Sequence, residues 1–342
     1  MNKKIISYLS GFIFIATFVK AQDYHVSQYD VATLYLNAGT TGMYGHETGD
    51  YKVYLDQRSQ WRSIGIKPFL TSYIAYDKPH TIRNRNVGFG AFIINNNGGL
   101  GNYNTFTFMG SAAYDILGKA DTKSTQKHIL SVGIQMGLFY RSTNPDKLNY
   151  DVQYSLANNG GAFDQSISSN EIYNRVNITR FDANYGLYYK YIERGEKVHP
   201  YAGFSMSHLT KPNESLVGGK TQMPIKFIGY GGCEIKIDDK MDIIPRIFYA
   251  NQAKANEFTG GLLFYYRINE NNVKIMAGFD YRLKDAYNIS LGLKHPSYAL
   301  RFSYDINASY LKNYTNGRGA LEVSLIYVGE KGKSFFKSVS QF

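Results

Sequence analysis

The pair of residues best suited to catalysis in this chain is an adjacent serine and histidine, Ser207 and His208. A serine hydrolase needs a histidine within hydrogen-bond reach of the serine hydroxyl, with a third group that orients the histidine. Neighbouring residues of a β-strand point to opposite faces, so these two side chains cannot form that pair in a strand. His199 precedes His208 by nine positions and faces the other way as well. The spacing therefore argues against a hydrolase.

Metal and phosphate sites are not indicated either. The chain has no HExxH or CxxC pattern, and its single cysteine, Cys233, excludes an internal disulfide framework. Gly98, Gly99 and Gly101 are followed by no Lys-Ser/Thr pair and no helical pattern, so a hairpin loop is favoured over a phosphate loop. We predict a protein that is not an enzyme and that needs no metal or cofactor.

Polar side chains instead recur at every second position of several segments. Arg301, Ser303, Asp305, Asn307 and Ser309 share one face, opposite the apolar side chains of residues 300–306. Such a polar ladder either binds an inserted peptide or fixes the register of the strands.

Arg58 and Gln60 show the same spacing and share a face with Lys52 and Asp56, whereas Trp61 falls on the opposite face and is expected at a lipid interface. Arg58 and Gln60 either hold the N-terminal segment or a partner peptide, or belong to a structural lattice of salt bridges. The complete candidate set for partner binding or a polar interior network is Arg58, Gln60, Asp280, Arg282, Asp285, Arg301, Asp305, Asn307 and Glu322.

The elements that must position these residues are amphipathic strands. In the run from Leu130 to Tyr140 apolar residues alternate with Ser131, Gly133, Gln135 and Gly137, as expected for a strand with one apolar and one polar face. Runs of about ten such residues, joined by turns, are typical of a closed transmembrane barrel. The main alternative is a secreted all-β protein rich in tyrosine.

About fourteen strands are expected, a count that could change by two because residues 70–77 and 241–251 alternate poorly. The expected strands are residues 51–61, 69–76, 87–95, 103–116, 128–141, 176–191, 199–209, 225–238, 242–251, 257–268, 273–284, 287–294, 299–309 and 320–328. The longest connections are residues 142–175 and 210–224. We predict an all-β, antiparallel transmembrane barrel of the outer-membrane type.

The termini are expected to lie outside the barrel wall. Residues 1–21 have two early lysines, an apolar stretch and a small residue at Ala21, which predicts a secretory signal peptide. Residues 22–50 are too polar and glycine-rich for a membrane strand and are interpreted as a plug, strap or binding segment. The barrel is placed at residues 51–328, and residues 329–342 form a C-terminal tail.

The composition suits a membrane barrel. The chain has 31 Tyr, 21 Phe and 33 Gly, which can supply interfacial aromatic girdles and crowded strand faces. Its net charge of +11 comes from Lys and Arg that are scattered along the strands. This distribution favours a polar interior and contact with anionic lipid over binding to nucleic acid.

Several ordered blocks resemble one family, the PorP/SprF membrane proteins of the type IX secretion system. They are QDYHVSQYDVATLYLNAGTTG (residues 22–42), Arg58-Ser59-Gln60-Trp61, VHPYAGFSMSHLTKPNES (198–215), Gly278-Phe279-Asp280-Tyr281-Arg282 and SYDINASYLKNYTNGRGALEVSLIY (303–327). The chain departs from the family in having Ala38 where a proline is usual.

The resemblance implies an outer-membrane barrel of Bacteroidota without hydrolytic or redox activity. The implied partners are subunits of the secretion machinery or a secreted client, in some members a gliding adhesin. The competing function is a passive or gated pore for small solutes.

Overall fold

Each of the alternating segments forms a β-strand in the structure, a computed structural model. It describes residues 23–44, 49–64, 67–119, 128–156, 161–173, 175–193, 195–216 and 218–329. The predicted signal peptide and nearly all of the predicted tail lie outside these residues. The wall strands are β1 (Tyr51–Gln60), β2 (Phe69–Ile82), β3 (Arg85–Gly98), β4 (Tyr103–Lys119), β5 (His128–Ser142), β8 (Asn177–Tyr191), β9 (Val198–Ser207), β10 (Lys226–Lys236), β11 (Met241–Gln252), β12 (Ala255–Arg267), β13 (Lys274–Arg282), β14 (Ala286–Lys294), β15 (Tyr298–Asn307) and β16 (Arg318–Gly329).

These strands form one closed antiparallel barrel, which confirms the predicted fold class. Each strand pairs with its neighbour in the chain, and β1 closes the ring by pairing with β16 from Tyr51↔Gly329 to Gln60↔Ala320. Closure satisfies the backbone groups at both edges of the sheet, which a wall within hydrocarbon requires. No described helix is long and apolar enough to cross a bilayer.

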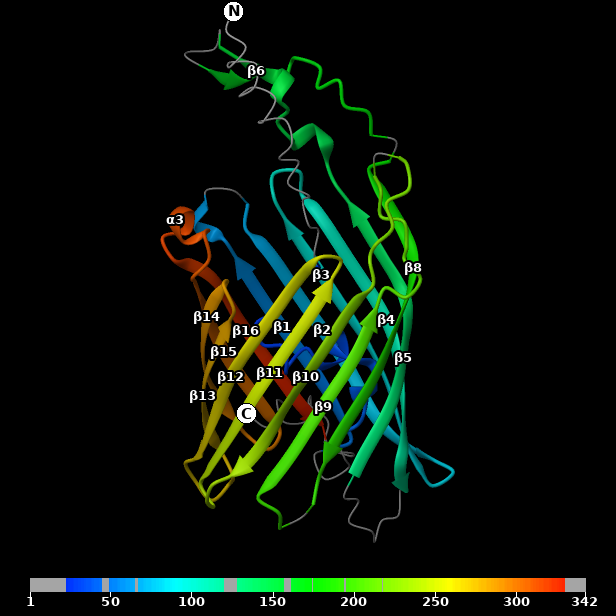
Figure 1. The fold of residues 1–342 in the computed structure, drawn as a ribbon, viewed down its shortest axis with the longest axis vertical. Coiled ribbons are helices and arrows are strands. Elements are labelled where there is room, and N and C mark those ends of the chain that lie inside the picture. Colours follow the sequence, from blue (N-terminus) through cyan, green and yellow to red (C-terminus); the bar gives the residue numbers. More distant parts are fainter. Residues whose placement is uncertain are drawn as a thin grey trace, which may run out of the picture.

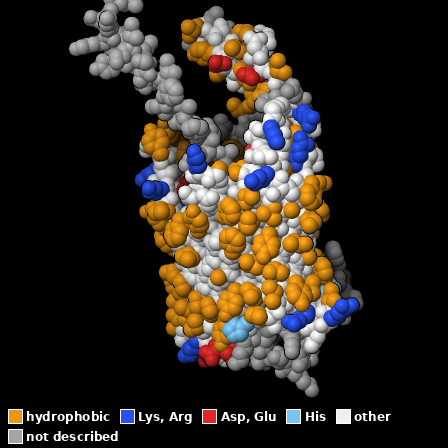
Figure 2. Space-filling model, turned by 45° about the vertical axis from the view of Figure 1, so that its right-hand side comes forward, with side chains coloured by type: hydrophobic (Ala, Val, Ile, Leu, Met, Phe, Trp, Pro, Cys, Tyr) orange, Lys and Arg blue, Asp and Glu red, His pale blue; other side chains and the backbone are white. Residues whose placement is uncertain are grey.

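The two faces of the wall differ as the period of two predicts. On β5, Ile134, Met136 and Leu138 are about half exposed on the outside, whereas Ser131 and Gln135 are buried inside. Figure 2 shows apolar side chains spread over the outer wall, with Lys and Arg gathered toward its two ends. This outer surface matches a hydrocarbon environment.

The connections differ greatly in length at the two ends of the barrel. Residues 143–176, 208–225 and 308–317 join strands at one end, and short turns such as residues 83–84 and 295–297 join them at the other (Figure 1). Outer-membrane barrels keep short turns in the periplasm and place long loops outside, so we assign the long-loop end to the cell exterior. The long loop 143–176 carries η4 (Pro145–Lys147), η5 (Asp151–Gln153) and the hairpin β6 (Tyr154–Ser155)–β7 (Ala162–Phe163), and η3 (Arg62–Ile64) and α3 (Lys312–Thr315) lie in two further outer loops.

The position of Trp61 differs from the prediction. Trp61 has a φ of 59°, so the strand alternation ends at Gln60 and no longer fixes the direction of the next side chain. The indole packs edge-on against Phe69, with ring centroids 5.3 Å apart, and lines a cavity inside the barrel. The expectation that Trp61 lies at the lipid interface is therefore wrong.

Residues 23–44, here called the lumen segment, lie inside the barrel. The segment contains the short helices α2 (Thr33–Leu36) and η1 (Ala38–Thr40), and appears in Figure 1 as the dark blue chain enclosed by the strands. Its apolar side chains form the main hydrophobic cluster with inward-facing residues of the wall. The cluster contains Val26, Tyr29, Ala32, Leu34, Leu36, Tyr54, Tyr73, Ala75, Phe92, Ile94, Met109, Ile228, Phe248 and Ala250.

Candidate functional site

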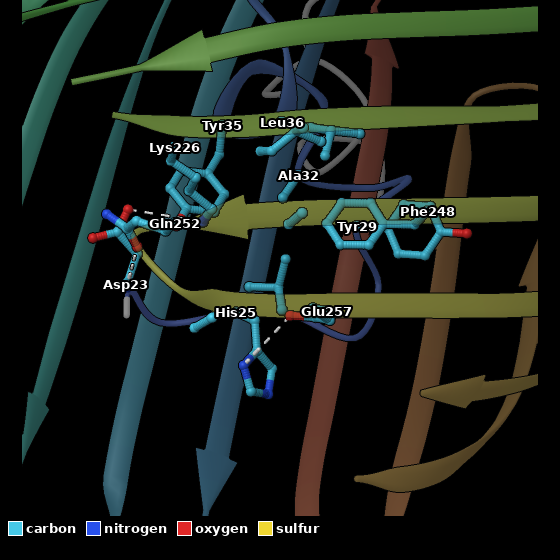
Figure 3. A pocket seen from close by; sticks show the side chains of 14 residues that line it. Asp23, His25, Tyr29, Ala32, Tyr35, Leu36, Lys226, Phe248, Gln252 and Glu257 are labelled. Carbon is cyan, nitrogen blue, oxygen red and sulfur yellow. Dashed lines mark hydrogen bonds and ion pairs between the residues drawn. The ribbon is translucent and has the colours of Figure 1, made fainter. Parts of the chain in front are cut away.

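The lumen segment packs against the wall through aromatic side chains. Tyr29 stacks on Phe248, with ring centroids 5.0 Å apart, and the guanidinium of Arg246 lies 4.8 Å from the centre of the Tyr29 ring. Figure 3 shows Tyr29 beside Phe248, and His25 directed toward Glu257. Leu34 is completely buried. These contacts bury an apolar surface of the segment that water would otherwise cover.

A first polar network holds the beginning of the segment. Arg58 binds Asp305 and Glu322 at 2.8 Å each, and its guanidinium also donates to the Ser27 hydroxyl at 2.7 Å. The Glu322 carboxylate accepts the backbone N–H groups of Ser27, at 2.9 Å, and Gln28, at 2.7 Å. Arg58 is 1 % exposed and Glu322 is 0 % exposed. The charges are therefore buried, paired and bonded directly to the segment backbone.

The Gln28 side chain extends this network along the wall. Its amide group donates to the Ser303 hydroxyl at 3.0 Å, and its oxygen accepts from the Ser324 hydroxyl at 2.5 Å. Arg282 binds Asp305 at 2.8 Å, and Asp285 pairs with Arg282 at the rim. Ser27 and Gln28 are thus fixed by β1, β13, β15 and β16 together.

A second network surrounds Asp30. Arg246 and Arg301 each approach an Asp30 oxygen at 2.7 Å, and Arg246 also binds Asp280 through two hydrogen bonds of 2.9 and 2.6 Å. The bidentate pairing fixes the plane of the Arg246 guanidinium. Arg301 reaches the Tyr265 hydroxyl at 3.3 Å. Asp30 supplies a carboxylate on which two wall arginines converge.

Close backbone approach fixes the second half of the segment. Gly133 of β5 and Gly186 of β8 are directly opposed in the sheet. A Cβ at Gly133 would overlap the backbone of Ala38, and one at Gly186 would overlap the Asn37 side chain. Glycine is therefore required at both wall positions because the segment backbone lies against them. Asn37 also donates to the Leu187 carbonyl at 2.7 Å.

His208 connects the start of the lumen segment to the wall. Its Nδ1 lies 2.5 Å from Asp182 and its Nε2 lies 2.8 Å from Asp23. His208 has a φ of 62°, so it leaves the strand after Ser207 and, like Ser207, lines a cavity inside the barrel. The predicted opposite orientation of Ser207 and His208 is therefore wrong, because it assumed that the strand continues. Both ring nitrogens of His208 contact carboxylates.

The neighbouring groups set the charge states of His208 and Asp23. Burial alone would lower the pKa of His208, but the Asp23 and Asp182 carboxylates outweigh burial and raise the pKa to about 9. Burial would raise the pKa of Asp23, whereas His208 and Lys226 together hold it below its ordinary value. At neutral pH a histidine cation therefore joins two carboxylates.

This pairing predicts a loss of stability in alkali. A histidine whose pKa is higher in the folded state contributes fully below its unfolded value near 6.5, and the contribution disappears as the pH rises through about 9. We expect the thermal midpoint, followed by heat-modifiable gel mobility, to fall between pH 7 and 10 by more in the wild type than in His208→Gln. The same fall in both proteins would contradict the pairing.

Above the lumen segment, toward the cell exterior, lies a cavity of about 320 Å³, here called the outer cavity. Its aromatic and thioether lining comes from both the segment and the outer halves of the strands, and includes Tyr24, Tyr35, Trp61, Phe69, Phe92, Tyr103, Met109, Phe139 and Met223. Arg141, Lys226 and His208 also reach it. Each of these cations contacts a carboxylate, respectively Glu214, Asp23 and Asp182. The cavity is thus aromatic with locally balanced charges.

The predicted site residues fall into four places. Arg58, Asp305, Glu322, Arg282 and Asp285 meet in the first network.

Asp280 and Arg301 belong to the second network. Gln60 lines the outer cavity. Asn307 instead donates to Thr315 and to the Arg318 carbonyl, which fixes the outer turn before β16. Their role in binding a partner stays a prediction.

Sequence reasoning did not identify Ser27, Gln28, Asp30, Arg246 or His208 as members of these contacts. The alternation of polar and apolar residues gave little indication of Arg246, because Phe248 and Ala250 on the same inward face are apolar. Among the described residues no cluster of His, Cys, Asp and Glu could hold a metal ion.

Comparison with known proteins agrees with this architecture. The family model described as "Type IX secretion system membrane protein PorP/SprF" matches residues 18–327. The chain belongs to the PorP/SprF family. A PorP/SprF protein is a membrane component of the type IX secretion system, and the barrel places this member in the outer membrane. A search among curated proteins finds no match.

A solved outer-membrane barrel shares the fold of this PorP/SprF protein. The toluene transporter TbuX of Ralstonia pickettii is 11 % identical with a TM-score of 0.51, over 86 % of this chain and 92 % of that one. The toluene transporter TodX of Pseudomonas putida is 9 % identical with a TM-score of 0.47, over 89 % of this chain and 94 % of that one. At these identities the likeness concerns the fold alone.

Proposed function

We propose that this PorP/SprF protein is a non-enzymatic binding component, which engages a secreted client or a subunit of the secretion machinery at its outer end. The client would be a protein that is exported to the cell surface or retained there, such as a gliding adhesin. The lumen networks of Arg58 and Asp30 would hold the lumen segment, so that the outer cavity and outer loops face the partner.

The observation that carries the proposal is an apolar surface on the long outer loop. Leu156 and Ile172 are 75 % and 78 % exposed, far beyond the wall that lipid covers. Figure 2 shows this projecting loop with apolar side chains and two acidic ones. Further large apolar side chains exposed on the loop are Val152, Tyr154, Phe163 and Ile167. Grouped apolar side chains in water mark surfaces that bind another protein.

Hydrogen bonds join the described residues of this loop to one another. The Tyr150 hydroxyl contacts the Tyr173 hydroxyl at 3.2 Å, and the Gln153 amide donates to the Ile167 carbonyl at 2.9 Å. The Asp164 N–H donates to the Gln153 carbonyl. A preformed surface loses less conformational entropy on binding than a flexible one.

The lumen segment supports binding over the alternative of a solute pore. A pore needs a continuous aqueous path, whereas the segment packs against strands on several sides and is fixed by two buried charge networks. Asp23 lies at the outer cavity, and Tyr44 donates to the Asp77 carbonyl farther down the wall. The segment therefore runs along the interior and not across one rim.

The experiment is affinity purification of the tagged chain from detergent-solubilised outer membranes of the native cell. We expect a machinery subunit, or a secreted client protein, to co-purify in near-stoichiometric amount. Leu156→Ser with Ile172→Ser should reduce its recovery at least tenfold. The matched control is Tyr310→Ser with Tyr314→Ser, since these exposed apolar residues lie on another outer loop. Equal recovery with both double variants would contradict binding through residues 143–173.

A further inference from the structure

The barrel wall is incomplete between β8 and β9 at its outer end. β8 pairs with β5 over its full length, from His128↔Tyr191 to Ser142↔Asn177. On its other side β8 pairs with β9 only from Tyr185 to Lys190, because β9 ends at Ser207. Residues 177–184 of β8 therefore present one edge without a strand partner.

A small hairpin lies against this edge. Residues 209–216 and 218–223, here called the cover hairpin, are joined by the bridge Asn213↔Gln222. The N–H of Glu214 donates to the Thr221 carbonyl at 2.9 Å, and the N–H of Met223 donates to the Pro212 carbonyl at 3.0 Å. These hydrogen bonds lie within the hairpin and use no group of the wall.

Few bonds attach the cover hairpin to β8. Among the described residues one backbone hydrogen bond does so, from the Leu209 N–H to the Ala183 carbonyl, and a second joins the N–H of Arg175, two residues before β8, to the Leu216 carbonyl. Between them the contacts come from side chains, with Thr210 donating to the Phe181 carbonyl and Arg180 to the Asn213 carbonyl. A regular strand partner would satisfy the edge with backbone bonds along this whole stretch.

The cover hairpin also separates this edge from the outer cavity. Met223 lines the cavity and packs with Phe139 and Ile178, and Leu216 packs against the same cluster. Displacing the hairpin would remove both apolar side chains from the interior and expose aromatic surface. Lys226 and His208 keep their carboxylates Asp23 and Asp182 when the hairpin leaves, whereas Arg141 loses Glu214, which belongs to the hairpin. The space vacated by Met223 and Leu216 therefore suits neutral apolar side chains, and only Arg141 is left without its ion-pair partner.

We propose that the cover hairpin is exchangeable, and that the β8 edge at residues 177–182 accepts one extended segment of the partner polypeptide. The segment adds a strand to the wall, and alternate large apolar or aromatic side chains take the place of Met223 in the outer cavity and of Leu216 against the adjoining cluster. Backbone bonds supply affinity and the aromatic pocket supplies selectivity. This inference rests on the proposed function and names the form in which the partner is recognised.

The test uses a blocked, fluorescent peptide that alternates threonine with tyrosine or valine. Its binding to the full chain in detergent is followed by fluorescence anisotropy. A second peptide of the same sequence carries N-methyl groups on alternate backbone nitrogens, which removes the donors needed for strand addition. We expect at least tenfold weaker binding of the methylated peptide. Equal affinity of the two peptides would overturn strand addition.

A reversible lock tests the exchange of the hairpin. Arg175→Cys with Leu216→Cys, in a Cys233→Ser background, joins two residues that are already hydrogen-bonded backbone to backbone. After the disulfide is verified by mass, the oxidised protein should bind the peptide at least tenfold more weakly, and reduction should restore binding. Each single cysteine variant is the control.

A photoreactive residue at Thr179 provides a readout that does not depend on disulfide formation, with Tyr287 of β14 as the control position. Cross-linking of the peptide at residue 179 and not at 287 is expected, and the reverse would overturn the site.

These experiments distinguish failure of the hairpin exchange from failure of the proposed function. Recovery of a secretion partner from outer membranes together with undiminished peptide binding by the oxidised lock would overturn the hairpin exchange and leave the proposed function standing. Failure of the wild type to co-purify any secretion partner would overturn the proposed function itself.

Discussion

Replacing Arg58 with alanine is expected to release the beginning of the lumen segment while the barrel wall stays folded. The variant leaves Glu322 without its arginine and Asp305 with Arg282 as its remaining ion-pair partner. Breaking one side of a buried ion pair costs about 3–5 kcal/mol because the remaining charge is buried without compensation. The wall itself keeps the continuous β1–β16 register that closes the barrel.

Amide hydrogen exchange measures this release directly, because the N–H groups of Ser27 and Gln28 donate to Glu322. Their protection factors should fall by roughly two to four orders of magnitude, as a cost of about 3–5 kcal/mol implies. Amides of β16 should keep their protection. Arg318→Ala is the matched control, since Arg318 is an exposed arginine on the same part of the wall. Unchanged protection of Ser27 and Gln28 would show that Arg58 does not hold the segment.

Replacing Asp30 with alanine is expected to loosen the middle of the segment to a similar extent. Arg246 and Arg301 converge on this carboxylate. Without it Arg246 keeps Asp280, whereas Arg301 keeps only its contact with the Tyr265 hydroxyl among the contacts described above. Two buried guanidinium groups would then face each other across the vacated space. The exchange of the Val31 and Ala32 amides, which donate to the Gln28 carbonyl, should accelerate by roughly two orders of magnitude.

The two variants should respond differently to a second substitution. Glu322→Gln removes the carboxylate that Arg58→Ala leaves without its arginine, so the double variant should recover part of the lost protection. Glu322 does not belong to the Asp30 network, so adding Glu322→Gln to Asp30→Ala should give no such recovery. Recovery in both variants, or in neither, would contradict the assignment of the charges.

Much of the wall follows from the period of two. Every predicted strand is present, because one face must meet hydrocarbon while the other faces the interior. The two runs with poor alternation are informative in retrospect. Tyr73 and Ala75 of β2, and Phe248 and Ala250 of β11, point inward although they are apolar, because they pack against the lumen segment. Where the interior is apolar, polarity no longer distinguishes the two faces.

The interior contacts could be predicted only in part. Arg58, Asp305 and Arg282 were identified because charges at alternate positions must be paired when buried. Their partners Ser27 and Gln28 lie nearly three hundred residues from Glu322 in sequence, and no periodicity connects them. Local patterns do not encode such long-range contacts.

Side-chain directions at the ends of strands could not be predicted from the alternation either. Trp61 and His208 both follow the last residue of a strand and both have positive φ, so extending the alternation by one residue misplaced them. The outer cavity and the short pairing of β8 with β9 depend on where these strands stop. The sequence predicted a long connection at residues 210–224. It did not predict that this connection folds into a hairpin that lies against the free edge of β8.

The most direct measurement of the central claim is electrical recording in planar bilayers. The central claim is that the lumen segment blocks the interior of the barrel and that the protein binds a partner. The intact chain should therefore show no steady ion conductance, whereas a variant lacking residues 23–44 should insert with the same heat-modifiable mobility and conduct. A stable open conductance of the intact chain, equal to that of the deletion variant, would contradict the account.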